Sequence, residues 1–234
     1  AYADAAQATG SGEHERVVRE VLAYVLRDLT SPEGAFYSAE DADSEGEEGL
    51  FYLWTVDEIV EVLGGNDGAF AVDLWNAHPE GNYLDEATQR KNGTNILHLQ
   101  ETFDDASARL EVERDQLDAR AEAVRTALFA SREDRVHPLK DDKVLADWNG
   151  LAIAALARAG RVLDDVSLVD SATRAADFVW DSMRSEEGRL FHSYRDGVAS
   201  VDGLLEDYAF LSYGLIELYQ ATQNTEHLER ALDL

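Results

Sequence analysis

Apolar residues recur at helical spacing along most of the chain. The run Val17, Val18, Val21, Leu22, Val25 is typical, and it predicts a helix over residues 14–30. The same criterion predicts helices over residues 1–9, 55–64, 67–76, 103–131, 151–163, 166–184 and 204–222, and from 226 onward. Polar, turn-rich segments at 31–54, 77–100, 132–146 and 185–203 are expected to be loops, with at most a short extended piece at 95–99.

The predicted helices are of two kinds. Residues 151–163 and 204–222 are apolar on nearly every face, as in Ala152-Ile-Ala-Ala-Leu-Ala157, so these helices should be buried. Residues 14–30 and 166–184 are apolar on one face only. Buried and two-faced helices in alternation predict an all-α fold of stacked helical hairpins with an inner and an outer layer.

Two short motifs occur twice. The segment Ser31–Ser38 (SPEGAFYS) resembles Ser185–Ser193 (SEEGRLFHS), and each follows a two-faced helix. The helix start at Asp147-Trp-Asn-Gly-Leu151 resembles the one at Asp207-Tyr-Ala-Phe-Leu211. In a layered fold, loops 31–57, 132–146 and 185–203 all run from outer to inner helices, so we expect them at one end, around an acidic and aromatic cleft.

Residues 34–54 combine aromatic side chains with a high density of negative charge. Between the pairs Phe36-Tyr37 and Phe51-Tyr52 lie Glu40, Asp41, Asp43, Glu45, Glu47 and Glu48. Crowded carboxylates of this kind can supply the acid and the base or nucleophile of glycoside chemistry. The alternatives are a solvated acidic loop, which is how we interpret Glu45 and Glu47, and a calcium loop.

The calcium interpretation rests on a partial motif. Asp41-x-Asp43-x-Glu45-Gly46 matches the start of an EF-hand loop, but Tyr52 occupies the position of the bidentate Glu. No His spacing indicates zinc, so we assign no metal ligand and no cofactor.

Composition narrows the function classes. The formal charge of −28, from 48 acidic and 20 basic residues, disfavours nucleic acid and anionic membranes as partners. Only Lys91, Lys140 and Lys143 are lysines, a pattern typical of halophilic proteins.

Cysteine is absent, no apolar run is long enough for a membrane span, and no signal peptide opens the sequence, so we expect a cytoplasmic protein. Because the sequence begins and ends within predicted helices, we expect it to be a fragment of a longer chain.

Several motifs together carry a family resemblance. Phe36-Tyr-Ser-Ala-Glu-Asp-Ala-Asp-Ser-Glu-Gly46, Phe51-Tyr-Leu-Trp-Thr55, Asn95–Leu99, Asp141–Leu151 and Leu205–Leu211 resemble the thioredoxin-domain-containing family that includes spermatogenesis-associated protein 20 and the bacterial YyaL-type proteins. The resemblance implies a thioredoxin-like domain followed by an (α/α) toroid of the six-hairpin glycosidase and N-acylglucosamine 2-epimerase type. Residues 1–234 would form a single toroid-domain fragment, without the thioredoxin-like domain and the first hairpins. Residues 83–93 look like an insertion relative to the family.

The candidate site follows from these patterns. We expect catalytic groups among Asp41, Asp43, Asp147, His192 and Asp207. His192 resembles in its setting the proton-transferring histidine of epimerases with this fold. Expected substrate-binding residues combine aromatic, carboxylate and polar side chains: Phe36, Tyr37, Glu40, Glu48, Trp54, Lys143, Trp148, Asn149, Glu206 and Tyr208.

Two functions remain open at this stage. The first is a sugar epimerase, isomerase or glycoside hydrolase acting on a small-molecule or glycan substrate. The second is a non-catalytic scaffold or carbohydrate-binding module that serves a thioredoxin-like domain. Taken alone, Asp147 reads as a helix N-cap and Trp148 as a core residue.

Overall fold

A computed structural model describes residues 1–85 and 88–234. The chain divides into two compact units, which we describe separately: residues 1–39 with 140–234, and residues 40–139. None of the helices in the described part of the chain combines the length and apolarity needed to cross a membrane.

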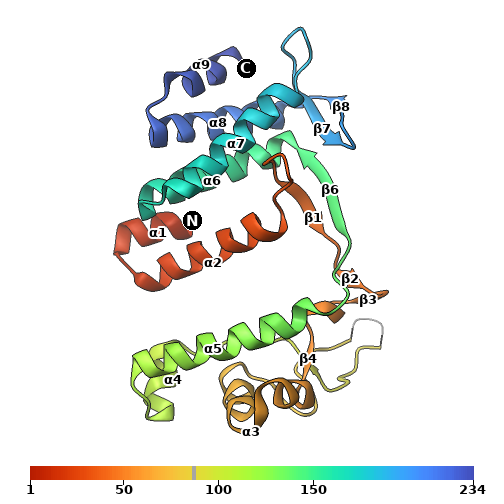
Figure 1. The fold of residues 1–234 in the computed structure, drawn as a ribbon, viewed down its shortest axis with the longest axis vertical. Coiled ribbons are helices and arrows are strands. Elements are labelled where there is room, and N and C mark those ends of the chain that lie inside the picture. Colours follow the sequence, from red (N-terminus) through yellow and green to blue (C-terminus); the bar gives the residue numbers. More distant parts are fainter. Residues whose placement is uncertain (86–87) are drawn as a thin grey trace. The chain divides into compact units, whose positions relative to one another are not determined.

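The first unit is built from three helical hairpins (Figure 1). They are α1 (Tyr2–Thr9) with α2 (Gly12–Asp28), α6 (Ala146–Leu163) with α7 (Val166–Ser182), and α8 (Leu205–Thr222) with α9 (Thr225–Asp233). The two helices predicted to be buried, α6 and α8, pack against each other over most of their length. The predicted all-α class is confirmed, and the three hairpins pack against one another.

Two glycines allow α6 and α8 to come close together. A Cβ atom on Gly150 would lie 2.4 Å from the backbone carbon of Phe210, and one on Gly214 would lie 2.5 Å from the carbonyl oxygen of Gly150. Real side chains do not tolerate such distances, so glycine is required for this contact. Around it, Ile153, Leu211 and Leu215 are almost fully buried in the core of the first unit.

The segments of the first unit that were predicted to be loops contain β-strands, so the prediction of irregular loops there is wrong. The strands β1 (Tyr37–Glu40), β6 (Lys140–Leu145), β7 (Phe191–Arg195) and β8 (Val198–Asp202) form one sheet in the order β1-β6-β7-β8. β6 and β7 pair with Val144 opposite Tyr194 and Leu145 opposite Ser193. These strands contain many polar and charged residues, so a search for apolar runs misses them. The sheet does bring three of the predicted inter-helix segments together.

The repeated motif has the same backbone structure in both copies. Ser31 N–H donates to Ala35 O at 2.7 Å, and Ser185 N–H donates to Arg189 O at 2.8 Å. The glycine in each copy, Gly34 and Gly188, has a positive φ, of 98° and 83°. Each turn follows an outer helix and leads into a strand of the same sheet. The internal repeat inferred from sequence is therefore a structural repeat.

The second unit contains a helical hairpin and short strand pairs. Its elements are β2 (Asp43–Ser44), β3 (Glu47–Glu48), η1 (Leu50–Tyr52), β4 (Trp54–Thr55), α3 (Val56–Leu74), β5 (Thr94–Asn95), α4 (Phe103–Leu110) and α5 (Arg114–Glu133). A capping box of Thr55 and Glu58 begins α3, and the interruption expected between residues 64 and 67 falls at Gly64. The short extended piece is also present, as β5 paired with β4, although it begins at Thr94.

The prediction of a single helix over residues 103–131 is wrong. The chain forms α4 and α5 instead, separated at Glu111, which adopts the left-handed conformation with φ 53°. Ser107 Oγ closes this turn by donating to Val112 O at 2.6 Å. The high helix propensity of the flanking residues concealed the break. Part of the predicted loop 77–100, and of the insertion predicted at 83–93, lies outside the described residues, at 86–87.

Candidate functional site

Three predicted catalytic residues meet in the first unit. His192 comes from β7, Asp147 from the first turn of α6 and Asp207 from the first turn of α8. One ligand-type atom from each residue lies within 4.8 Å of the other two. The prediction that the helix starts and the repeated turn share one end is therefore confirmed for these residues.

Asp207 organises the site. Its side chain is fully buried and accepts hydrogen bonds from Leu204 N–H at 2.7 Å and from Asp147 N–H at 3.0 Å. The first bond caps α8, and the second ties the start of α6 to the start of α8. A carboxylate at a helix N-terminus also interacts favourably with the helix dipole. These contacts fix the carboxylate in a single orientation.

His192 completes the arrangement. Its Nδ1 lies 3.0 Å from Oδ1 and 3.2 Å from Oδ2 of Asp207. Since the carboxylate oxygens can only accept, Nδ1 carries the proton, and Nε2 of the neutral ring is left as a proton acceptor. Within residues 1–85 and 88–234, no group makes a hydrogen bond to Nε2. The His192 side chain keeps 25% of its surface exposed to solvent.

The neighbouring predicted residues divide into exposed and structural groups. Trp148 is 52% exposed beside Asp147, so its interpretation as a core residue is wrong. Asp147 is not the N-cap of α6, which is Leu145; its Oδ1 accepts the N–H of Trp148 at 2.8 Å. Glu206 is exposed next to Asp207, while Lys143 forms an ion pair with Asp141 at 3.1 Å.

Asn149 and Tyr208 hold the two repeated turns. Asn149 is buried, accepts the N–H of Phe36 at 2.8 Å and donates to the carbonyl of the same residue at 2.9 Å. Tyr208 Oη accepts the N–H of Leu190, which is the counterpart of Phe36 in the repeat, at 3.1 Å. Both side chains lie in the first turns of inner helices, so their role in this structure is to fix β1 and β7 against α6 and α8.

The remaining candidates of the acidic and aromatic segment are not part of this trio. Asp41 and Asp43 belong to the second unit, where both are exposed and Asp41 Oδ1 accepts the N–H of Asp43 at 3.2 Å. Asp43 also lies opposite Glu48 in the β2–β3 hairpin. Glu40 is 3.4 Å from Tyr52 Oη.

The aromatic candidates of the segment are core residues. Phe36 and Trp54 are each 4% exposed, in the cores of the first and second unit respectively. Tyr37 packs beside Phe36, and burial is the first cause that raises the pKa of its phenol.

The predicted acidic loop does not have the form of a calcium site. Glu45 and Gly46, both with positive φ, make the two-residue turn of the β2–β3 hairpin. Among the described residues, Asp147, His192 and Asp207 are the group whose ligand atoms converge closely enough for a metal ion. Three donors already bind the Asp207 carboxylate, however, and a metal on Nδ1 would have to replace one of them. The arrangement therefore suits a proton-carrying histidine better than a liganded one.

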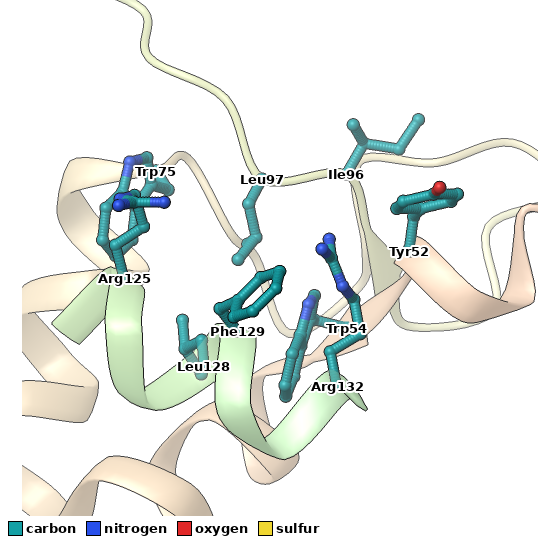
Figure 2. A pocket seen from close by; sticks show the side chains of 9 residues that line it. All are labelled: Tyr52, Trp54, Trp75, Ile96, Leu97, Arg125, Leu128, Phe129 and Arg132. Atoms are coloured by element: carbon teal, nitrogen blue, oxygen red, sulfur yellow. The ribbon is translucent and has the colours of Figure 1, made fainter. Parts of the chain in front are cut away.

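A cavity in the second unit was not anticipated from the sequence. It has a volume of about 520 Å³ and is lined by Tyr52, Trp54, Trp75, Ile96, Leu97, Arg125, Leu128, Phe129 and Arg132 (Figure 2). Four of these residues, at positions 125, 128, 129 and 132, form one face of α5. That spacing is visible in the sequence, but it describes any two-faced helix, and only the folded unit shows that the face borders a cavity.

The fold and the trio define a protein of helical hairpins in which a histidine from strand β7 pairs with an aspartate in the first turn of an inner helix. The whole chain aligns with spermatogenesis-associated protein 20 of Rattus norvegicus, with 34% identity over 259 residues, and with the human protein, with 34% identity over 267 residues. This match confirms the resemblance to the spermatogenesis-associated protein 20 family. The chain spans about a third of the length of these curated relatives. No family model matches the sequence.

Two solved structures align with most of this chain at low sequence identity. Cellobiose 2-epimerase from Bacillus thermoamylovorans B4167 matches 94% of this chain and 53% of its own, with 12% identity and a TM-score of 0.38. A D-mannose isomerase matches 97% of this chain and 50% of its own, with 13% identity and the same TM-score. At these values the two matches carry no argument about activity, which has to come from the site itself.

Proposed function

We propose that the first unit carries an acid–base site that moves a proton on a sugar, as in a sugar isomerase or epimerase. The observation that carries this proposal is the pairing of a partly exposed His192 with a fully buried Asp207. Asp207 fixes the tautomer and orientation of the ring, so Nε2 is available to remove a proton from a carbon next to a carbonyl group. A general base in position contributes roughly 10²–10⁴ to the rate of such a step.

Trp148 supports a sugar as the substrate class. Its indole is half exposed in the first turn of α6, next to Asp147 of the trio. Exposed indole faces stack against the apolar face of a sugar ring, and the carboxylate of Asp147 can accept hydrogen bonds from hydroxyl groups. In this proposal His192 is the catalytic base, Asp207 the positioning residue, and Trp148 and Asp147 bind the substrate.

Glycoside hydrolysis fits the trio less well. That chemistry requires two accessible carboxyl groups on opposite sides of the scissile bond, separated by about 5–9.5 Å. Asp207 is fully buried and engaged by three donors, so Asp147 is the only accessible carboxylate within the trio. A carbohydrate-binding role without catalysis is the second candidate, and the exposed Trp148 is the observation that favours it.

Proton exchange with solvent tests the proposed base directly. The chain is incubated in D₂O with a panel of aldoses and ketoses, and NMR follows the loss of the proton next to the carbonyl carbon. We expect exchange with at least one sugar, and a rate at least about a hundredfold lower in His192→Gln because the base is removed. His14→Gln, which changes a partly exposed histidine of α2, serves as the matched control and should retain the full rate.

Two results would oppose the proposal. Equal exchange by His192→Gln and the wild type would exclude His192 as the base. Sugar binding without exchange, detected through the fluorescence of the chain and lost in Trp148→Ala, would instead establish the non-catalytic binding role.

A further inference from the structure

The cavity of the second unit contains an arginine without an acidic partner. Most arginines of this chain are paired with carboxylates, as expected for a formal charge of −28. Arg132 is different: among residues 1–85 and 88–234 no carboxylate lies within ion-pair distance of it. Its Nε is buried and has no hydrogen-bond partner. A buried polar donor without a partner is uncommon and needs an explanation.

Aromatic rings hold this guanidinium in place. The Arg132 carbon Cζ lies 5.1 Å from the ring centre of Phe51, 5.0 Å from that of Tyr52 and 5.3 Å from that of Phe129. Figure 2 shows the side chain reaching into the space between Tyr52 and Phe129, above Trp54. Stacking on rings orients a guanidinium but leaves its N–H donors unused, so they are available to an anion that enters the cavity.

A second arginine, Arg135, interacts electrostatically with Arg132. Arg135 lies one turn further along the chain, over the ring of Trp54, with its Cζ 4.1 Å from the ring centre. Burial is the first cause that lowers the pKa of Arg135, and the charge of Arg132 lowers it further. The donors of Arg135 go to backbone carbonyls, at 2.6 Å to Leu53 and 3.1 Å to Phe51, and its one ion pair is a loose contact of 3.6 Å with Glu58.

The other residues that line the cavity are mainly aromatic and aliphatic. Trp54, Leu128 and Leu97 are largely covered, and Ile96 and Tyr52, which are 49% and 40% exposed, lie where solvent reaches it. The volume of about 520 Å³ falls within the range of small-molecule sites, and a mainly apolar pocket with few polar groups is the usual form of such a site. Arg125 also lines the cavity, but its guanidinium is engaged by Glu122 at 2.6 Å.

From these contacts we infer that the cavity of the second unit is a binding site for a small ligand that combines a flat apolar body with one anionic group, and that Arg132 binds the anion. The apolar body lies against Trp54, Phe129 and Leu97, and the unused N–H donors of Arg132 pair with the anionic group. This site is distinct from the His192–Asp207 pair of the first unit and does not depend on the function proposed there.

A pair of fluorescent probes tests the inference. 8-Anilinonaphthalene-1-sulfonate has an aromatic body and one anionic group, whereas N-phenyl-1-naphthylamine has the same aromatic body without the charge. Both are titrated into the 234-residue chain, and binding is followed by energy transfer from tryptophan. We expect the sulfonate to bind with one-to-one stoichiometry, and more tightly than the uncharged probe.

Variants assign the effect to Arg132. In Arg132→Gln, affinity for the sulfonate should fall at least about tenfold, because a charge-assisted hydrogen bond is lost, while affinity for the uncharged probe stays the same. Arg120→Gln is the matched control. Arg120 lies on the same helix and also stacks on a ring, that of Phe70, but it is paired with Asp67 and does not line the cavity. It should leave both affinities unchanged.

Arg132→Lys keeps the experiment decisive if the glutamine variant loses its fold, which near-UV circular dichroism would detect. Lysine retains the charge, so binding of the sulfonate should persist with reduced affinity. The inference is overturned if the two probes bind the wild type equally, if the sulfonate does not bind, or if its affinity is the same in the wild type and in a folded Arg132→Gln variant.

Discussion

Replacing Asp207 with Asn removes one charge and almost no volume from the centre of the candidate site. The carboxylate accepts Leu204 N–H on Oδ2 at 2.7 Å and Asp147 N–H on Oδ1 at 3.0 Å, with His192 Nδ1 between the two oxygens. An amide has only one oxygen. Whichever way the amide is oriented, its NH₂ group therefore faces a backbone N–H that has no alternative acceptor.

The expected loss of stability follows from these contacts. A buried donor left without an acceptor costs about 1–3 kcal/mol, and a lost helix cap costs about 0.5–2 kcal/mol. We therefore expect Asp207→Asn to lower the free energy of unfolding by roughly 2–4 kcal/mol, and to reduce any turnover at His192 because the ring loses its fixed tautomer. Equilibrium urea unfolding followed by circular dichroism measures the first effect.

Asp147→Asn is the matched control for this prediction. Asp147 is partly exposed, and its carboxylate accepts only the N–H of the adjacent Trp148. An asparagine can accept the same bond, so the loss should stay below about 1 kcal/mol. If the two variants were equally stable, the hydrogen bonds to Asp207 would not be what joins α6 to α8, and our account of the site would be refuted.

Further predictions concern the helix contact, the turn clamp and pH. Gly150→Ala should destabilise by at least about 1–3 kcal/mol because its Cβ would collide with the backbone at Phe210, whereas Gly65→Ala, with open space around it, should be neutral or stabilising in the same urea assay. Asn149→Ala should lower the free energy of unfolding by about 1–3 kcal/mol, since it leaves the N–H and carbonyl of Phe36 unpaired; equal melting temperatures of variant and wild type would contradict this role. Burial lowers the pKa of His227, so the unfolded chain takes up the proton first, and stability should decrease as pH falls below the ordinary value of 6.5. The slope, at most about 1.4 kcal/mol per pH unit, should vanish in His227→Gln when urea midpoints are measured between pH 7.5 and 5.

Several features of this protein are determined locally and could be read from the sequence. Apolar periodicity located the helices of the first unit, because a helix that buries one face or all faces must show it in the order of its residues. The repeated turn at Ser31 and Ser185 was also predicted, since it depends on a few adjacent residues and a glycine with positive φ. The family resemblance rests on the same short motifs.

Tertiary structure decided the rest. The strand β6 lies about a hundred residues from its neighbour β1, and its partners in β7 are 48 and 50 residues away, so no local pattern predicts these pairings. The sequence predicted Asp147, His192 and Asp207 near one end of the fold, together with Asp41 and Asp43, but only the close contact of α6 and α8 at Gly150 and Gly214 decides which of them meet. The aromatic and acidic segment that dominates the sequence supplies none of that trio, because its carboxylates face solvent in the β2–β3 hairpin. A charge is visible in a sequence, but its environment, which determines its chemistry, depends on residues far away along the chain.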